Sequence, residues 1–98
     1  MAITRKAVRT VLGAEVLLRR RGQIPYRVQI YDISVHGCKV EFVDRPKLDE
    51  IVWVKVEGLE ALEATICWVK GHSAGVEFAR PIHPAVLQLL LSRLETPH

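Results

Sequence analysis

Along most of this chain, apolar and polar residues alternate one by one. Successive side chains of an extended strand point to opposite faces, so this alternation predicts β-strands with one buried face. The clearest alternating segments cover residues 24–30, 38–42, 52–56, 64–68 and 74–78, and a less regular one covers 14–20. In this interpretation the apolar residues of each segment, Ile24 included, face a common core.

Turn-forming residues separate these segments. They are Arg21-Gly22-Gln23, Asp44-Arg45-Pro46, Gly58 and Gly71-His72-Ser73. Glycine and proline at such positions favour tight connections between antiparallel neighbours. Because the strands are short and joined by short turns, the pattern predicts a mainly β fold, a closed or nearly closed six-stranded antiparallel β-barrel.

The pattern changes near the C-terminus. Pro81 ends the last strand, and Pro84 suits the first turn of a helix, which we expect within residues 83–95 with its regular part over 85–94. One face of this helix is apolar and predicts packing on the barrel; it consists of Val86, Leu87, Leu90, Leu91 and Leu94. Leu89 lies outside that face, and a second interpretation gives it a contact with a partner or with a second copy in a weak homodimer.

Length and composition fit one small folded domain over residues 1–98, with an N-terminal arm (1–12), the barrel (13–80) and the helix. Half of the residues are apolar (49%), which excludes a disordered chain. No run of 18 uncharged apolar residues indicates a membrane span. The first residues lack the apolar stretch of a signal peptide, so we expect a cytoplasmic protein without membrane insertion.

No set of residues indicates a metal site or a catalytic centre. Cys38 and Cys67 stand far apart without paired metal-ligand spacing, and both fall in apolar strand patterns that predict buried, reduced thiols. The four histidines are scattered, and no nucleophile with its base is recognisable. We therefore expect a protein that is not an enzyme and carries no cofactor or metal.

Positive charge is concentrated at the N-terminus. Residues 1–21 contain six basic residues and one acidic residue, whereas residues 22–98 contain eight basic and ten acidic ones. Such an imbalance fits an anionic partner, and it fits a solvated basic face equally well.

An RxxxR pair, Arg5 and Arg9, precedes the first predicted strand. The two side chains share a face whether the segment is helical or extended. Guanidinium groups bond bidentately to phosphate or to the O6 and N7 atoms of guanine, and they stack on rings. By itself this motif is common.

A DxSxxG motif, with Asp32, Ser34 and Gly37, ends the second predicted strand and turns into the third. A carboxylate accepts hydrogen bonds from the N1–H and N2–H₂ edge of guanine, a role that arginine cannot fill. The serine hydroxyl bonds a phosphate or its own backbone, and the glycine allows a positive φ and close approach of a ligand. The alternative is a plain turn in which the three residues cap and bend the chain.

The two motifs together, in this order and spacing, resemble the PilZ family. Residues 67–69 resemble a late strand of that family, and residues 74–78 resemble its closing strand. The resemblance implies a six-stranded barrel of the split-barrel type, a C-terminal helix and a flexible N-terminal arm that folds over one or two intercalated molecules of cyclic di-GMP.

By this resemblance, Arg5 and Arg9 grip guanine and phosphate, Asp32 bonds the guanine edge, and Ser34 and Gly37 shape the floor of the site. Lys6, His36 and Trp68 are further contributors, and Trp68 either stacks on the ligand or belongs to the core. Many members carry two adjacent arginines at the start of the arm, whereas Thr4 and Lys6 flank Arg5 here, so the ligand stoichiometry stays open.

The expected function is therefore a receptor that changes shape and signals to an unidentified downstream protein in motility, biofilm or exopolysaccharide control. Two alternatives remain. One is a degenerate PilZ-like interaction module that no longer binds nucleotide. The other is a small barrel for single-stranded nucleic acid, for which the few aromatic residues offer little support, so no nucleic acid is expected.

Overall fold

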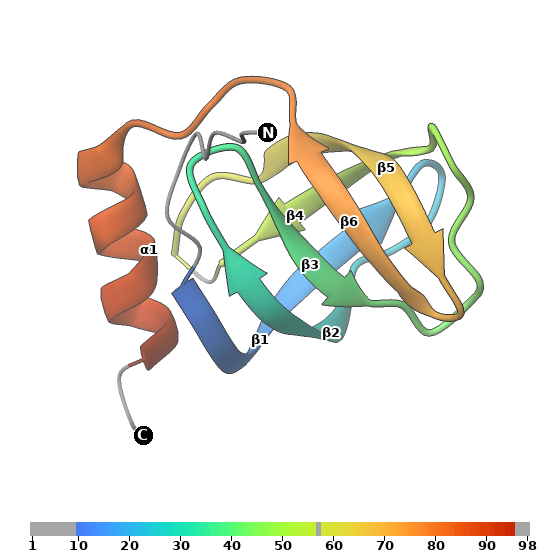
Figure 1. Cartoon of the computed structure of the whole chain (residues 1–98), viewed down its shortest axis with the longest axis horizontal. Coiled ribbons are helices and arrows are strands. Elements are labelled where there is room, and N and C mark those ends of the chain that lie inside the picture. Colours follow the sequence, from blue (N-terminus) through green and yellow to red (C-terminus); the bar gives the residue numbers. More distant parts are fainter. Residues whose placement is uncertain (1–9, 57, 96–98) are drawn as a thin grey trace, which may run out of the picture.

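The computed structural model describes residues 10–56 and 58–95, which form six strands and one helix (Figure 1). The predicted arm residues Arg5, Lys6 and Arg9 lie outside the described residues. The elements, in chain order, are β1 (Thr10–Arg20), β2 (Tyr26–Ile33), β3 (Gly37–Glu41), β4 (Ile51–Lys55), β5 (Leu62–Lys70), β6 (Ser73–Phe78) and α1 (Pro84–Glu95).

The strands close into one barrel in the order β1-β2-β3-β6-β5-β4, and every neighbouring pair is antiparallel. The long strand β1 closes the ring, because its first part pairs with β2 and its last part pairs with both β2 and β4. The predicted mainly β barrel with a C-terminal helix is thus confirmed. The predicted turns are also confirmed, with positive φ angles at Gly22, Gly58 and Gly71.

Alternation supplies the core of the barrel. In β2 the side chains of Val28 and Ile30 are buried, whereas the side chain of Arg27, which precedes Val28, is exposed. The largest fully buried side chains are those of Leu18, Ile30, Ile33, Cys38, Val40, Val52 and Ile66. Burying one such aliphatic side chain contributes roughly 1.5–3 kcal/mol, so the interior of the barrel is the main source of stability.

Irregular pairing interrupts the alternation in three strands. The register shifts between Val11 and Ala14 in β1, between Ile30 and Asp32 in β2, and between Ile66 and Trp68 in β5. Such a bulge places two residues opposite one and changes which side chains face outward.

Two expectations about β5 are wrong, because the bulge changes which side chains face outward. Trp68 is 39% exposed and lies on the outer face, so its assignment to the core is wrong. Cys67 is also exposed, although its thiol lies 3.3 Å from the carbonyl oxygen of Gly75. Cys38 is buried as predicted.

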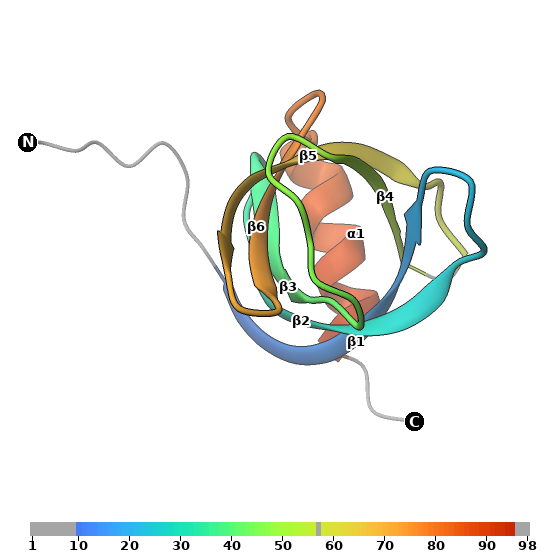
Figure 2. The same cartoon turned by 90° about the vertical axis from the view of Figure 1, so that its right-hand side faces the viewer.

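Helix α1 covers one end of the barrel, as the view along the barrel in Figure 2 shows. The ring nitrogen Nδ1 of His83 accepts a hydrogen bond from the backbone N–H of Ala85, which caps the first turn. Leu90 is buried at 2% exposure, and Leu89 is 43% exposed as the pattern predicted. Val86 was expected on the buried face but is exposed. No helix within the described residues is long and apolar enough to cross a membrane.

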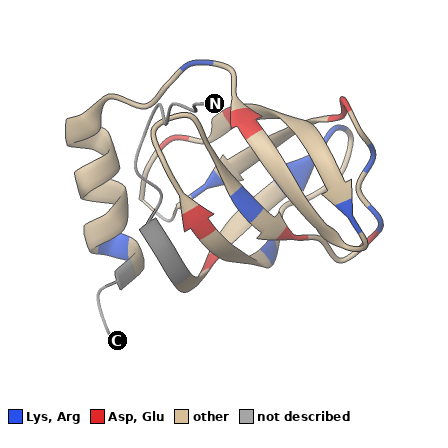
Figure 3. Cartoon of the chain, viewed as in Figure 1, with Lys and Arg blue, Asp and Glu red and all other residues tan. Residues whose placement is uncertain are grey.

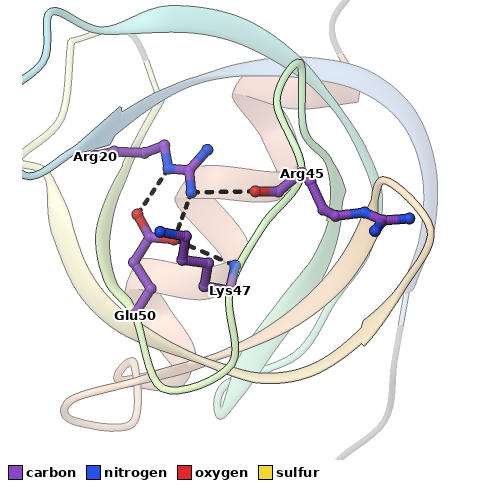
Figure 4. A network of polar contacts seen from close by, with 4 residues as sticks. All are labelled: Arg20, Arg45, Lys47 and Glu50. Carbon is purple, nitrogen blue, oxygen red and sulfur yellow. Dashed lines mark hydrogen bonds and ion pairs between the residues drawn. The ribbon is translucent and has the colours of Figure 1, made fainter.

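The opposite end of the barrel is crossed by the β3–β4 loop, residues 42–50. Arg20, at the end of β1, bonds Glu50 twice at 2.6 and 2.7 Å and also donates to the carbonyl oxygen of Arg45 (Figure 4). Glu50 accepts a further bond from the backbone N–H of Lys47. This network holds the loop across the mouth of the barrel.

Ile24 lies at the same end but takes no part in the core. β2 begins only at Tyr26, and Ile24 sits in the preceding turn with 83% of its surface exposed. The expectation that Ile24 faces the core is therefore wrong. Its apolar side chain extended the alternating pattern past the true start of the strand.

Candidate functional site

The DxSxxG motif forms the hairpin between β2 and β3, at the α1 end of the barrel (Figure 1). The backbone N–H of Ser34 donates to the carbonyl oxygen of Gly37 at 2.8 Å. The Ser34 hydroxyl accepts from the backbone N–H of His36 at 3.2 Å. Ser34 is buried at 3% exposure, so its hydroxyl first of all closes the turn, as in the alternative that the sequence left open.

Neighbouring segments hold this hairpin in place. The carbonyl oxygen of His36 accepts from the N–H of Phe78 at 2.8 Å, and that of Val35 accepts from the N–H of Ile82 at 2.7 Å. Both donors belong to the end of β6 and the connection to α1. Because its carbonyl groups are satisfied by other elements, the turn is a fixed platform and not a loose loop.

Gly37 is required for a different reason than the sequence indicated. Its φ is not positive, so that expectation is wrong. A Cβ atom at this position would collide with the carbonyl oxygen of Val76 on the neighbouring strand β6. The glycine therefore allows two strands to approach closely behind the turn.

Asp32 lies one residue before the end of β2, half-buried, and pairs with Lys39 of β3 on one side. On its other side it pairs with Val11, while Thr10 pairs with Ile33. The first described residues of β1 thus run directly beside the DxSxxG hairpin. The RxxxR motif ends at Arg9, one residue before Thr10, and lies outside the described residues.

A row of outward-facing positions continues from Asp32 across four strands. Asp32 of β2 pairs with Lys39 of β3, Lys39 pairs with Gly75 of β6, and Gly75 pairs with Trp68 of β5. The Trp68 ring lies on Gly75, where any Cβ atom would collide with it. The row therefore joins a carboxylate, a cation and an indole on one outer face of the barrel.

Tyr31, Glu41 and Ser73 form a hydrogen-bonded cluster on the same face. The hydroxyl groups of Tyr31 and Ser73 both donate to Oε1 of Glu41, at 2.9 and 2.8 Å. The bonds from Ser73 and Tyr31 lower the pKa of the Glu41 carboxyl, and the bond to Glu41 raises the pKa of Tyr31. Glu41 is therefore ionised at neutral pH and fixes the position of the Tyr31 ring.

Comparison with known protein families identifies the family of this chain. The model of the PilZ domain matches residues 3–95, which is nearly the whole chain. This chain belongs to the PilZ domain family. No curated protein matches it.

The fold is also similar to a solved structure, the inhibitor of motility MotI/DgrA from Bacillus subtilis. The two are 20% identical with a TM-score of 0.67, and the match covers 93% of this chain and 49% of the other. The chain thus spans about half the length of that protein. PilZ domains are receptor or adaptor domains of the cyclic di-GMP type, and family membership places this chain in that class.

Among the predicted site residues within the described part of the PilZ domain, the structure brings Asp32, Ser34, His36 and Gly37 together in one hairpin. It places Trp68 on the same outer face, on the far side of β3 and β6. Sequence reasoning missed Lys39 and Tyr31, because each is a polar or aromatic residue that fits an ordinary alternating strand. The bulges that bring these side chains together cannot be recognised from the alternation of apolar and polar residues.

Proposed function

We propose that this PilZ domain is a cytoplasmic bacterial receptor that binds cyclic di-GMP and relays the signal to a separate partner protein. The observation that supports this most directly is the pairing of β1 with β2. Thr10 and Val11 pair with Ile33 and Asp32, so the chain enters the barrel from its RxxxR segment beside the DxSxxG hairpin. The last arginine of the RxxxR motif immediately precedes Thr10 in the sequence, which supports a site shared by the two motifs.

In this proposal each residue type has a defined chemical role. Asp32 accepts the N1–H and N2–H₂ donors of one guanine, and Arg5 and Arg9 bind phosphate and the O6 and N7 edge. Ser34 and Gly37 keep the floor of the site in shape. Trp68, on the outer face, offers a ring for stacking.

The proposed mechanism is closure of the arm over the ligand against a fixed hairpin. The hydrogen bond between Val35 and Ile82 connects the hairpin to the segment that leads into α1. Ligand binding would thus create a new surface from the arm, the hairpin and the bound nucleotide, which a partner in motility, biofilm or polymer synthesis can recognise.

Binding of single-stranded nucleic acid has less support from the same face. Acidic and basic positions are interspersed over the described strands and loops (Figure 3). A protein that follows a nucleic-acid backbone needs a continuous positive groove lined by stacking aromatic residues. In this view the described strands and loops carry both acidic and basic positions.

The test is calorimetric titration of the purified protein with cyclic di-GMP and, in parallel, with cyclic di-AMP. Adenine lacks the N1–H and N2–H₂ donors, so cyclic di-AMP would lose the hydrogen bonds from guanine to the Asp32 carboxylate, at a cost of about 1–3 kcal/mol. We expect binding of cyclic di-GMP, with cyclic di-AMP at least about tenfold weaker. Equal affinities would refute the role of Asp32, and no binding of either ligand would favour a degenerate interaction module.

A further inference from the structure

Lys39 occupies a position in this face that neither sequence motif contains. It lies in the middle of β3 and points outward, between the buried residues Cys38 and Val40. Its backbone pairs with Asp32 on one side and with Gly75 on the other. Because paired strands lie about 5 Å apart, the side chain projects next to the carboxylate that is proposed to bind guanine.

Two aromatic rings hold the Lys39 side chain. Its Nζ atom lies 5.4 Å from the centre of the Tyr31 ring and 5.9 Å from the centre of the Trp68 ring. Both distances fall within the range of cation–π attraction. The rings are themselves restrained, since Tyr31 is hydrogen-bonded to Glu41 and Trp68 lies on Gly75.

Within the described residues, the Lys39 ammonium group forms no ion pair within 4.0 Å, in contrast to Arg20 with Glu50 and Arg27 with Glu15. The nearest acidic group along its own strand, Glu41, is occupied by two hydroxyl donors. Lys39 therefore presents a pre-positioned cation on a partly exposed surface. Its three N–H donors suit a phosphate group.

Glu41 also sets the direction of an incoming anion. It lies two residues beyond Lys39 on the same face of β3, farther from the DxSxxG hairpin. The carboxylate is held ionised and repels a phosphate on its own side of Lys39. The favourable approach is therefore from the hairpin side, where Asp32 lies.

We propose that Lys39 binds a phosphate of cyclic di-GMP, and that Tyr31 and Trp68 position its side chain. This inference rests on the proposed function. Phosphates link the two guanosines of this ligand, so a guanine bonded to Asp32 places an anionic group close by. The row from Asp32 through Lys39 to Trp68 then contacts a base edge, a phosphate and a ring face in succession.

The experiment compares the affinity for cyclic di-GMP of the wild-type protein, Lys39→Met, Lys39→Arg and Lys55→Met. Met keeps the length and apolar stem of the side chain and removes the charge. Lys55 is an exposed residue of β4, which lies three strands from β3 in either direction around the barrel, so it is a matched control. Thermal denaturation verifies that each variant is folded.

We expect Lys39→Met to weaken binding about 10- to 100-fold, which corresponds to one charge-assisted hydrogen bond. Lys39→Arg should keep most of the affinity, and Lys55→Met should match the wild type. Affinity should also depend less on salt in Lys39→Met than in the wild type, because one screened charge pair is missing.

A second pair of variants tests the positioning role of Tyr31. Tyr31→Leu removes the ring, whereas Tyr31→Phe retains it and loses only the bond to Glu41. We expect Tyr31→Leu to weaken binding several-fold. Tyr31→Phe should keep most of the affinity, because its ring still holds the Lys39 side chain. Equal losses in the two variants would overturn this role.

The affinities of the wild type and of Lys39→Met distinguish a failure of the Lys39 assignment from a failure of the receptor function. If the wild type binds cyclic di-GMP and Lys39→Met binds equally well, Lys39 is not a phosphate ligand, while the receptor function stands. If the wild type does not bind the ligand at all, both proposals are overturned.

Discussion

The two ends of this barrel use polar residues in opposite ways. At the mouth, Arg20 and Glu50 are largely buried and satisfy one another, with the loop backbone taking the remaining bonds. Along the outer face that begins at the DxSxxG hairpin, Asp32, Lys39 and Trp68 lie partly exposed. Charges that the chain satisfies internally hold the fold together, whereas those arranged on an outer face are the candidates for recognition.

The contacts of Arg19 and Arg20 also change the interpretation of the basic N-terminal stretch, residues 1–21. Its charge excess suggested an anionic partner, but Arg20 is absorbed by Glu50, and Arg19 lies over the Trp53 ring at 4.1 Å. Part of the excess is therefore structural. The other basic residues of the stretch are the exposed Arg21, which follows β1, and Arg5, Lys6 and Arg9, which precede it.

The largest expected effect concerns binding through the arm. Arg5→Ala and Arg9→Ala should each weaken cyclic di-GMP binding by roughly 2–4 kcal/mol, because charge-assisted bonds and stacking are lost. Arg9→Lys should restore little, since lysine lacks the planar fork. Calorimetry measures the affinity, with Arg27→Ala, an exposed residue of β2, as the control. Full rescue by lysine would show that charge alone matters.

A substitution at the mouth of the barrel should lower stability and leave ligand affinity nearly unchanged. Arg20→Ala leaves the Glu50 carboxylate without its main partner, and we expect the free energy of unfolding to fall by about 2–3 kcal/mol, below the cost for a fully buried pair because Glu50 is partly exposed. Urea denaturation measures this loss, and affinity for cyclic di-GMP should stay within a factor of about two. A large loss of affinity with unchanged stability would reverse the assignment of the two ends.

Much of the fold follows from the sequence, because a buried barrel face requires strict alternation. The strands, the turns at Gly22, Gly58 and Gly71 and the terminal helix were all predicted. The same logic failed for Ile24, where alternation continued into a turn, and for Val86, where an apolar residue stays exposed at the helix start. Apolar character alone does not tell a buried position from an exposed one at the end of an element.

The candidate site was less accessible to sequence reasoning. Its motif residues were recognisable, but a bulge adds one residue without a fixed sequence mark, so the outward turn of Trp68 could not be derived from spacing. The role of Lys39 depends on pairing between β2, β3 and β6, which are not all adjacent in the chain. Gly37 does not have the positive φ that the motif suggested, and its close neighbour is the carbonyl oxygen of Val76.

Acid should weaken the ion pair at the mouth of the barrel. The hydrogen bond from Arg20 lowers the pKa of Glu50. A carboxyl group with a lowered folded pKa contributes stability above its unfolded value, near 4.3, and loses it as the pH falls through the folded pKa. We expect the stability difference between the wild type and Glu50→Gln to shrink by on the order of 1 kcal/mol between pH 6 and pH 3. Denaturant titrations across this range measure it, and a difference independent of pH would contradict the contribution of this ion pair.

The smallest expected effect on stability concerns α1, which belongs to the hairpin end. Leu89 is 43% exposed, whereas its neighbour Leu90 packs into the core. Leu89→Glu should change the free energy of unfolding by no more than about 0.5 kcal/mol, as for other exposed positions. Leu90→Glu is the matched variant and should cost several kcal/mol, because it buries a charge without a partner.

If the exposed side of α1 is a contact surface, Leu89→Glu should also abolish any self-association that sedimentation velocity detects in the wild type, with and without cyclic di-GMP. The reason is physical: Leu89 and Val86 lie one helical turn apart, so both expose apolar surface on one side of α1. A carboxylate in the middle of such a contact would be desolvated on association. A dimer that persists in Leu89→Glu would move the contact elsewhere. A loss of stability equal to that of Leu90→Glu would instead place Leu89 in the core, and Val86 alone would then remain of this apolar surface on α1.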